Sequence, residues 1–339
     1  MKCVTTRGKY FVGLCFLAII SAACASTPLV KPPSTTNPNS TLNTHPSTTV
    51  AKQSTTSQSS ATSTSNTSFV HEHVFVIVME NLGYSAALAT PTLASLANHW
   101  VHATNYYATT HPSLPNYISL VAGSTLGITS DCVTCFVNAP SLMDEMDHAG
   151  ISWASYMESI PNSCYLAPYA VGNLYAAKHD PFVYFQDIRN SPTLCANIQP
   201  LHALETMLNS NSTNIANFVW ITPNLCNDGH DCAPSTAATW LSQMVSTITS
   251  SSAWQQNGAL YITWDEGNGG DYSALNSANQ VVPNGGGGHI LTIVVEPKLP
   301  HGTTISAPLD HYSLLKTIET NFNLGLLGAS SNTSLAVLP

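Results

Sequence analysis

HVFVIVMEN, residues 73–81, joins an unbroken apolar run rich in β-branched residues to a carboxylate and an amide. The run lacks the alternation of apolar and polar residues that marks a half-exposed strand, so it predicts a strand buried on both faces. Such strands belong to parallel sheets that are covered by helices. Glu80 and Asn81 therefore follow the carboxyl end of a predicted core strand, which is the edge where open α/β sheets bind ligands.

Strand and helix patterns alternate along the rest of the chain. Further strands are predicted at residues 151–157, 217–222, 259–266 and 290–297. Helices are predicted at residues 91–101, 141–150, 201–208, 235–251 and 310–322, and another begins near Ser113. This alternation predicts an α/β fold with a mostly parallel central sheet flanked by helices.

The first 25 residues are typical of an export signal, because three basic residues precede an apolar run and the small residues of SAACAS. The apolar run at residues 10–20 is too short to be a stable membrane anchor. Cleavage at Ala23-Cys24-Ala25 would release a secreted protein. SAAC also resembles the box of bacterial lipoproteins, which would place a lipid anchor on Cys24. Either outcome puts the protein outside the cytoplasm, secreted or at a bacterial cell surface.

Residues 26–68 are rich in Ser and Thr and contain only two charged side chains, Lys31 and Lys52. This segment cannot bury enough apolar surface to offset the entropy lost on ordering, so we expect a disordered linker. The folded domain is then expected at residues 69–339. A domain of about 270 residues can enclose one large core.

Six of the nine cysteines lie in the predicted domain, and an even number in an exported chain indicates disulfides. Proximity in the sequence suggests the pairs Cys132–Cys135, Cys164–Cys195 and Cys226–Cys232. The alternative for the CVTC segment at residues 132–135 is a zinc or redox motif, although the chain has no second CxxC.

The formal net charge is −9 at pH 7, and no basic stretch could follow a nucleic-acid backbone. Nucleic acid is therefore not an expected partner, and we expect no obligate protein partner. An acidic protein that acts on anionic substrates needs a local positive centre, which a metal ion can supply.

Polar residues follow several of the predicted strands, and the carboxyl ends of parallel strands share one edge of a sheet. Asp265 and Glu266 are adjacent carboxylates, which repel each other unless a cation lies beside them. No Lys or Arg is close to them in the sequence, and hard oxygen donors suit a divalent or trivalent ion. We therefore expect one metal ion, held by Glu80, Asn81, Ser113, Asp265 and Glu266.

THPSLPNYISLVAG, residues 110–123, places Ser113 at the start of a predicted helix. Ser113 could cap this helix by accepting a backbone N–H, with Pro115 in the first turn. A hydroxyl at a helix N-terminus also faces a site that favours anions, and a metal ion would lower its pKa. The polar residues expected at the same sheet edge favour this second interpretation over the cap.

Four histidines outside this stretch are considered for a role in the site. His230 lies in a loop flanked by Cys226 and Cys232, and it is either a phosphate ligand or general acid, or part of a disulfide-stapled, Asx-rich turn. His289 after NGGGG and His311 at the start of the last helix each fit a structural role about as well as contact with substrate. His179 in KHDPFVYF is expected to be structural or to orient its neighbours.

Seven motifs together resemble the phosphoesterase family of secreted acid phosphatases and bacterial phospholipases C, within the alkaline phosphatase superfamily. They are VIVMEN, TPTLASLA, YYATTHPSLPNYISLVAG, KHDPFVYF, TPNLCNDGHD, TWDEG and DHYSLLKTIE. The resemblance covers nearly all of the chain after the predicted linker. It implies an alkaline-phosphatase-like sheet and a phosphorylated residue at a helix start, which here is Ser113.

The resemblance also implies roles for individual residues. Glu80–Asn81 and Asp265–Glu266 match the family's two pairs of metal ligands. Catalytic roles fall on Ser113, His230 and His111, and substrate contacts fall on Asn116, Asp228, His289 and His311. The best-known two-zinc members have a histidine where this chain has Glu266, which favours a single harder ion such as calcium, magnesium or iron.

The sequence thus predicts an exported, metal-dependent acid phosphatase that hydrolyses small phosphate monoesters through a Ser113 phosphoenzyme. Alternatives are a phospholipase C-type phosphodiesterase that acts on lipid head groups, and a phosphoinositide phosphatase. A surface-binding protein that retains the fold without catalysis is a further alternative.

Overall fold

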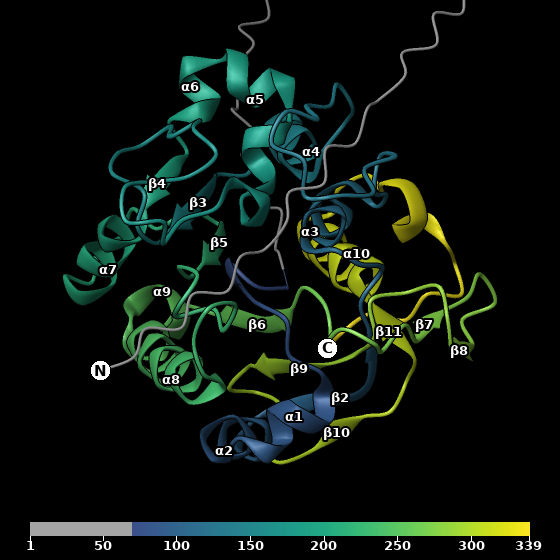
Figure 1. The fold of residues 1–339 in the computed structure, drawn as a ribbon. Helices are drawn as coiled ribbons and strands as arrows, with labels where there is room; N and C mark the ends of the chain where they lie inside the picture. The colour runs from purple at the N-terminus through teal and green to yellow at the C-terminus, as the bar shows by residue number, and fades with distance from the viewer. Residues whose placement is uncertain (1–69) are drawn as a thin grey trace, which may run out of the picture. The chain divides into compact units, whose positions relative to one another are not determined.

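The computed structural model describes residues 70–339, so the predicted leader at residues 1–25 and linker at residues 26–68 lie outside the described residues. Residues 70–339 form an α/β structure in which helices pack on a central sheet (Figure 1). The sheet is mostly parallel, which confirms the predicted fold class.

The strand order in the central sheet is β10-β2-β9-β6-β1-β5-β3-β4, and β11 also pairs with β2. The bounds are β1 His73–Met79, β2 Val101–Tyr107, β3 Trp153–Met157, β4 Ile198–Pro200, β5 Phe218–Thr222, β6 Gly258–Trp264, β9 His289–Val295, β10 Thr304–Ile305 and β11 Leu309–Asp310. β1 pairs in parallel with β5 and β6, whereas β9 is antiparallel to β6 and β2. A separate two-stranded sheet consists of β7 Ala274–Leu275 and β8 Val281–Val282.

The helices pack on both sides of this sheet. They are α1 Tyr84–Ala89, α2 Pro91–His99, α3 Ser113–Ala122, α4 Leu142–Ala149, α5 Gln186–Asn190, α6 Pro192–Cys195, α7 Leu201–Asn209, α8 Pro234–Ser250, α9 Ser252–Gln255 and α10 His311–Phe322. Three 3₁₀ turns are η1 Ala177–His179, η2 Pro181–Tyr184 and η3 Gly328–Ser331. α3 and α10 pack together on one side, and α7, α8 and α9 lie on the other (Figure 1).

The stretch at residues 73–79 forms the strand that its pattern predicts. Val74 to Met79 are all fully buried, and β1 lies between β5 and β6 in the middle of the sheet. Burial on both faces removes this apolar run from water, which is the main favourable free energy of folding. The carboxyl end of β1 is thereby fixed in the core, and Glu80 with it.

β2 is a strand that the sequence analysis missed. The predicted helix at residues 91–101 ends at His99, and Val101 already belongs to β2. Polar residues such as His102 and Asn105 interrupt the apolar pattern of β2, and a bulge between Ala103 and Tyr106 shifts its register against β9. A bulge disturbs the two-residue period from which a strand is recognised.

α3 begins at Ser113, as predicted, but Ser113 does not cap it. The N-cap residue is Pro112, and no side chain accepts a hydrogen bond at this position. The Ser113 hydroxyl donates to Glu80 instead. The capping interpretation of Ser113 is therefore wrong.

The three predicted disulfides are confirmed. Their Cα–Cα distances are 5.8, 4.9 and 4.7 Å for Cys132–Cys135, Cys164–Cys195 and Cys226–Cys232. The CVTC segment thus holds a disulfide rather than a zinc ion.

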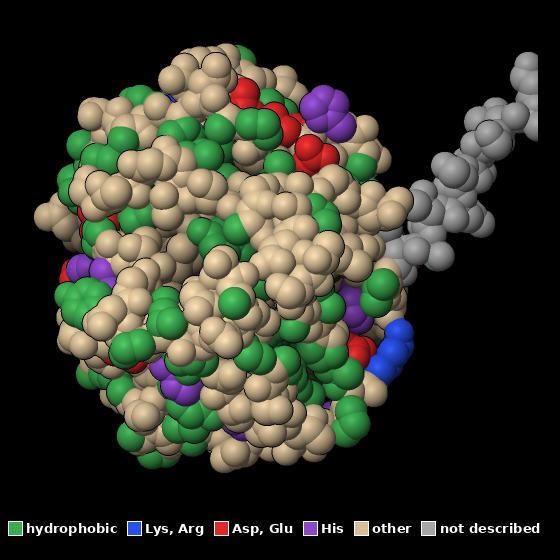
Figure 2. Space-filling model, turned by 90° about the vertical axis from the view of Figure 1, so that its right-hand side faces the viewer, with side chains coloured by type: hydrophobic (Ala, Val, Ile, Leu, Met, Phe, Trp, Pro, Cys, Tyr) green, Lys and Arg blue, Asp and Glu red, His purple; other side chains and the backbone are tan. Residues whose placement is uncertain are grey.

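The surface carries few cations. Figure 2 shows one face of the molecule, on which Lys and Arg side chains are rare among uncharged polar and hydrophobic ones. Within residues 70–339, no helix has the length and the apolarity needed to cross a membrane.

Glu319 is a buried carboxyl group in α10. Its Oε1 accepts a hydrogen bond from the Leu327 N–H at 2.8 Å, and its Oε2 has no hydrogen-bond partner among residues 70–339. Burial raises the pKa of Glu319 to about 7. The folded chain therefore keeps this proton at pH values where the unfolded chain has lost it.

We predict that this group lowers stability as the pH rises from 4.5 to about 7. The variant E319Q should raise the free energy of unfolding at neutral pH by about 1–3 kcal/mol and change it little in mild acid. Urea denaturation at both pH values checks this, with E205Q on α7 as the matched control. An equal effect of E319Q at both pH values would contradict the prediction.

Candidate active site

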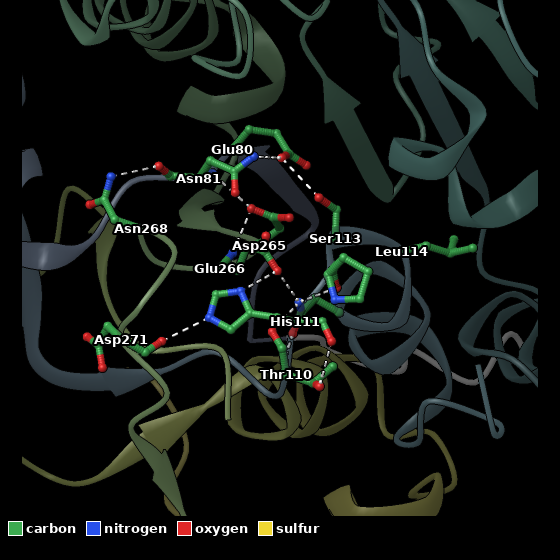
Figure 3. Close-up of polar contacts among 12 residues, drawn as sticks. Glu80, Asn81, Thr110, His111, Ser113, Leu114, Asp265, Glu266, Asn268 and Asp271 are labelled. Carbon is green, nitrogen blue, oxygen red and sulfur yellow. Dashed lines mark hydrogen bonds and ion pairs between the residues drawn. The ribbon is translucent and has the colours of Figure 1, made fainter. Parts of the chain in front are cut away.

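The carboxyl ends of β1 and β6 meet the start of α3 at one edge of the sheet (Figure 3). Glu80 follows β1, Asp265 follows β6 and Ser113 begins α3, and each is at most 1% exposed. The Ser113 hydroxyl donates a hydrogen bond to Glu80 Oε2 at 3.2 Å. The structure therefore brings together three residues of the predicted metal site that are far apart in the sequence.

Asn81 connects the two carboxylates at this edge. Its φ of 51° lies in the left-handed region, which Asn adopts more readily than most residues. Its Nδ2 donates to Glu80 Oε2 at 3.0 Å, and its backbone N–H donates to Asp265 Oδ1 at 3.1 Å. Asn81 thus holds Glu80 and Asp265 in a fixed relation to each other.

Asp265 is held in the core by backbone contacts. Its N–H donates to the Met79 carbonyl at 2.9 Å, and its Oδ1 accepts from the Glu266 N–H at 2.6 Å. Burial, followed by the negative charges of Glu80 and Glu266, raises the pKa of Asp265 well above its usual range. A cation beside these carboxylates would offset both effects.

His179, from η1, lies at the same edge. Its Nε2 is 2.8 Å from Glu80 Oε1, its Nδ1 is 3.2 Å from Asp228 Oδ2, and its ring stacks on Tyr117. Burial lowers the pKa of His179, but the charges of Glu80 and Asp228 and the hydrogen bonds to both carboxylates together outweigh burial and raise the pKa to about 9. The sequence analysis expected His179 only to be structural or to orient its neighbours. The one sequence feature that pointed to the site was the position of His179 in the KHDPFVYF motif.

Asp265 Oδ2 is buried at this edge and has neither a hydrogen-bond nor an ion-pair partner among residues 70–339. Glu80 Oε1, His179 Nε2 and Asp228 Oδ2 form no well-aligned hydrogen bond and are compensated only by the two ion pairs of His179. Buried polar atoms without partners are rare in folded proteins, so each requires an explanation. A metal ion is one such explanation, because carboxylate oxygens and imidazole nitrogens are both metal ligands.

The donor groups fit a metal ion in geometry as well. Ligand atoms of Glu80, His179 and His230 all lie within 4.8 Å of one another. Asp228 Oδ2 pairs with the second ring nitrogen of His179, Nδ1. In metal sites, a carboxylate in this position orients the metal-bound imidazole. This group shares only Glu80 with the five residues predicted from the sequence, and it adds two histidines.

His230 lies in the loop closed by the Cys226–Cys232 disulfide. Its backbone N–H donates to Asp228 Oδ1 at 2.7 Å, and its Nδ1 is 2.6 Å from Asp231 Oδ1. Its Nε2 is 3.0 Å from the Lys178 Nζ. The predicted residues Asp228 and His230 therefore do reach this edge.

Lys178 and Asp131 are residues of the site that the sequence analysis did not single out. The Lys178 Nζ lies 3.5 Å from Ser113 Oγ and 3.2 Å from Asp131 Oδ2. Asp131 Oδ1 accepts a hydrogen bond from the Leu114 N–H in the first turn of α3 at 3.0 Å. Lys178 is far from Ser113 in the sequence, so only its place in KHDPFVYF could have pointed to it.

His111 and Asn116 lie on the other side of Ser113. The His111 Nδ1 is 2.9 Å from Glu266 Oε2, and its Nε2 is 2.9 Å from the Asp271 carbonyl oxygen (Figure 3). The Asn116 amide bonds mainly to the backbone of Thr110, where its Oδ1 accepts at 2.9 Å and its Nδ2 donates at 2.7 Å. Asn116 therefore fixes the loop that carries His111.

His289 and His311 make their contacts elsewhere. The His289 Nε2 is 3.1 Å from the Thr104 carbonyl oxygen, and its ring stacks on Tyr84. The His311 Nε2 is 2.6 Å from the Asp265 carbonyl oxygen, and burial lowers the pKa of His311 to about 4. His311 thus supports the backbone of Asp265, and neither ring forms a described hydrogen bond to Ser113.

Comparison with known proteins identifies the family. The family model described as "Phosphoesterase family" matches residues 23–325, so this chain belongs to the phosphoesterase family. The chain is similar to a probable acid phosphatase of Kluyveromyces lactis, with 30% identity over 75% of this chain and 59% of that protein. It is similar to an acid phosphatase of Aspergillus fumigatus, with 28% identity over 75% of this chain and 55% of that protein.

A third relative is covered more fully. It is a phosphatidylinositol-3-phosphatase of Mycobacterium tuberculosis, with 30% identity over 77% of this chain and 80% of that protein. Against the two fungal relatives, by contrast, the chain spans less than three-fifths of their length. Among solved structures, a protein in the alkaline phosphatase superfamily from Vibrio parahaemolyticus matches 74% of this chain and 66% of that chain, with a TM-score of 0.48 and 11% identity.

We predict that the purified protein binds metal through Glu80 and His179. The variants E80Q and H179Q should each lose most of the bound metal, because each removes a ligand from a buried site. Elemental analysis of the purified variants checks this. E72Q, which changes a carboxylate just before β1, is the matched control and should keep the wild-type metal content. A wild-type metal content in both site variants would refute the assignment.

Proposed function

We propose that this chain is a metal-dependent phosphatase that hydrolyses phosphate monoesters through a phosphorylated Ser113. The position of Ser113 carries the proposal, because its hydroxyl donates to the buried Glu80 carboxylate at 3.2 Å. The hydroxyl also begins α3, and a helix N-terminus favours an incoming anion. Membership of the phosphoesterase family and the phosphatase names of the relatives support this reaction class.

In the proposed reaction, Ser113 Oγ forms a bond to phosphorus while the bond to the leaving oxygen breaks, and the hydroxyl proton of Ser113 passes to Glu80 Oε2, the acceptor of its hydrogen bond. The bonding electron pair stays on the leaving alcohol oxygen, which takes a proton from a histidine. Water then cleaves the phosphoserine and releases inorganic phosphate. Positioning and charge neutralisation supply most of the rate enhancement in reactions of this type.

Two histidines are candidates for the proton donor, His230 and His111. Both ring nitrogens of His111 face acceptors, one on Glu266 and one on the Asp271 backbone. The hydrogen bond to Glu266 raises the pKa of His111, so this ring retains both protons to a higher pH than an isolated histidine. These contacts favour His111 as the donor, because the Nε2 of His230 faces the Lys178 Nζ instead.

The metal ion would be held by Glu80 and His179, with Asp265 as a further donor and with Asn81, Ser113 and Glu266 from the set predicted by sequence. When bound, it would supply positive charge that lowers the hydroxyl pKa and neutralises phosphoryl oxygens. Imidazole donors favour a transition metal such as iron over calcium or magnesium.

Phosphoinositides are the second candidate substrate class. The relative that this chain covers most evenly is named for activity on a phosphatidylinositol phosphate. We also propose that the protein works outside the cytoplasm, because its three disulfides persist in oxidising surroundings. A lipid anchor on Cys24, which would hold the protein at the cell surface, is part of this proposal.

We predict that S113A abolishes phosphatase turnover while it leaves the fold and most of the metal content intact. The reason is that the variant removes the attacking oxygen but keeps the Glu80 and His179 side chains that would hold the metal. S119A, in the same helix, removes a buried hydroxyl that bonds to the Pro115 carbonyl and should keep its activity. Rates with 4-nitrophenyl phosphate, together with elemental analysis, check both variants. Near-normal turnover by S113A would remove Ser113 from the mechanism.

A comparison of substrates separates the proposed class from the phospholipase C alternative. We expect the wild-type protein to hydrolyse 4-nitrophenyl phosphate much faster than 4-nitrophenyl phosphorylcholine. The reason is that a monoester presents one more free oxygen to the positive groups around Ser113. Release of nitrophenol from each compound, followed across acidic and neutral pH, is the measurement. Preference for the diester would favour the phospholipase C reaction.

A further inference from the structure

Residues 70–339 contain only four Lys and Arg residues, and one of them lies beside Ser113. The other three have partners elsewhere. The Arg189 guanidinium lies over the Phe136 ring, Lys298 bonds to Asn257, and Lys316 bonds to backbone carbonyls of residues 332 and 335. Lys178 is therefore the one permanent cation in the described part of the chain that can face an anion bound at Ser113.

The Lys178 ammonium is held at a fixed point by three groups. Its Nζ lies 3.2 Å from Asp131 Oδ2, 3.0 Å from His230 Nε2 and 3.5 Å from Ser113 Oγ. Asp131 is itself anchored by the Leu114 N–H at the start of α3. The Asp131 carboxylate beside the ammonium, and Glu80 beyond the Ser113 hydroxyl, are negative groups that favour the charged form of Lys178. The ammonium therefore remains charged.

The contact with His230 also fixes the proton on that ring. An ammonium group can only donate, so His230 Nε2 must accept from Lys178. The proton of the neutral imidazole then sits on Nδ1, where Asp231 Oδ1 accepts it at 2.6 Å. In this arrangement His230 presents no proton toward Ser113, and the donor that faces the Ser113 oxygen on this side is Lys178.

We propose that Lys178 is a catalytic residue of the phosphoryl transfer, an inference that rests on the function proposed above. Its ammonium donates a hydrogen bond to a non-bridging oxygen of the phosphoryl group while Ser113 Oγ attacks phosphorus. Lys178 keeps its protons throughout, and the leaving oxygen takes its proton from a histidine. Asp131 is a positioning residue that holds the ammonium on the Ser113 side.

The test uses the full chain with the substitutions K178M and K178R, and K298M is the matched control for loss of an exposed lysine. We expect K178M to lower kcat/KM for 4-nitrophenyl phosphate about 10²–10³-fold, as removal of one donor to a developing anion does elsewhere. K178R keeps the charge and should recover part of this loss. K178M should also weaken the binding of inorganic phosphate, measured by calorimetry, about tenfold.

A double-mutant cycle with H230A separates direct action from action through His230. If Lys178 contacts phosphate itself, K178M/H230A loses more activity than H230A alone. Equal activity of K178M/H230A and H230A would overturn the catalytic role. The catalytic role would also be overturned if K178M had the same turnover and the same phosphate affinity as K298M.

The two proposals fail in different ways. If the wild-type protein hydrolyses no phosphoester, the proposed function fails, and the phosphate affinities of K178M and K298M still test the role of Lys178 as an anion ligand. If the wild-type protein is active and S113A is not, the proposed function stands. An active K178M would then refute the role of Lys178 alone.

Discussion

The buried carboxylate of Glu80 is the constraint around which this edge of the molecule is arranged. A carboxylate that is 1% exposed is costly unless hydrogen bonds and opposite charge compensate it. Ser113 and Asn81 donate to one oxygen, and His179 faces the other. The Glu80 backbone N–H donates to the Asp228 carbonyl at 3.0 Å, which ties the loop after β5 to the end of β1. The side chain and backbone of this one residue thus link α3, η1 and two strand ends.

Glu80 also divides the site into two halves with different chemistry. On one side are the oxygen donors of Asn81 and Asp265, followed by Glu266 and its partner His111. On the other side is a nitrogen-rich group that contains His179, His230 and Lys178. A phosphoryl group bound at Ser113 would meet positive charge from the second half, while the first half supplies most of the negative charge. The adjacent acidic residues of TWDEG are tolerated in this structure because Glu266 pairs with His111 and Asp265 accepts hydrogen bonds from two backbone N–H groups.

The sequence predicted those parts of the molecule that depend on a local pattern. The apolar run of β1 and the polar residues after β1 and β6 are local features, and both the sheet and the meeting of Glu80, Asp265 and Ser113 followed from them. β2 was missed because its bulge and its polar residues hide the strand period. Asp131, Lys178 and His179 were missed as site residues because the loop at 131 and the short turn η1 have no periodicity, and only the tertiary fold brings them to Ser113. The roles of His289 and His311 were left open for the same reason, since a lone histidine at an element boundary shows nothing of its partners.

Two of the disulfides lie next to residues of this site. Cys132 directly follows Asp131, and Cys226–Cys232 encloses the loop that carries Asp228 and His230. Reduction would restore to both loops the conformational freedom that the crosslinks remove. Only the buried sheet and its helices would then hold the remaining groups. The two loops that contact the Lys178 ammonium are therefore each stiffened by a crosslink that persists only in oxidising surroundings.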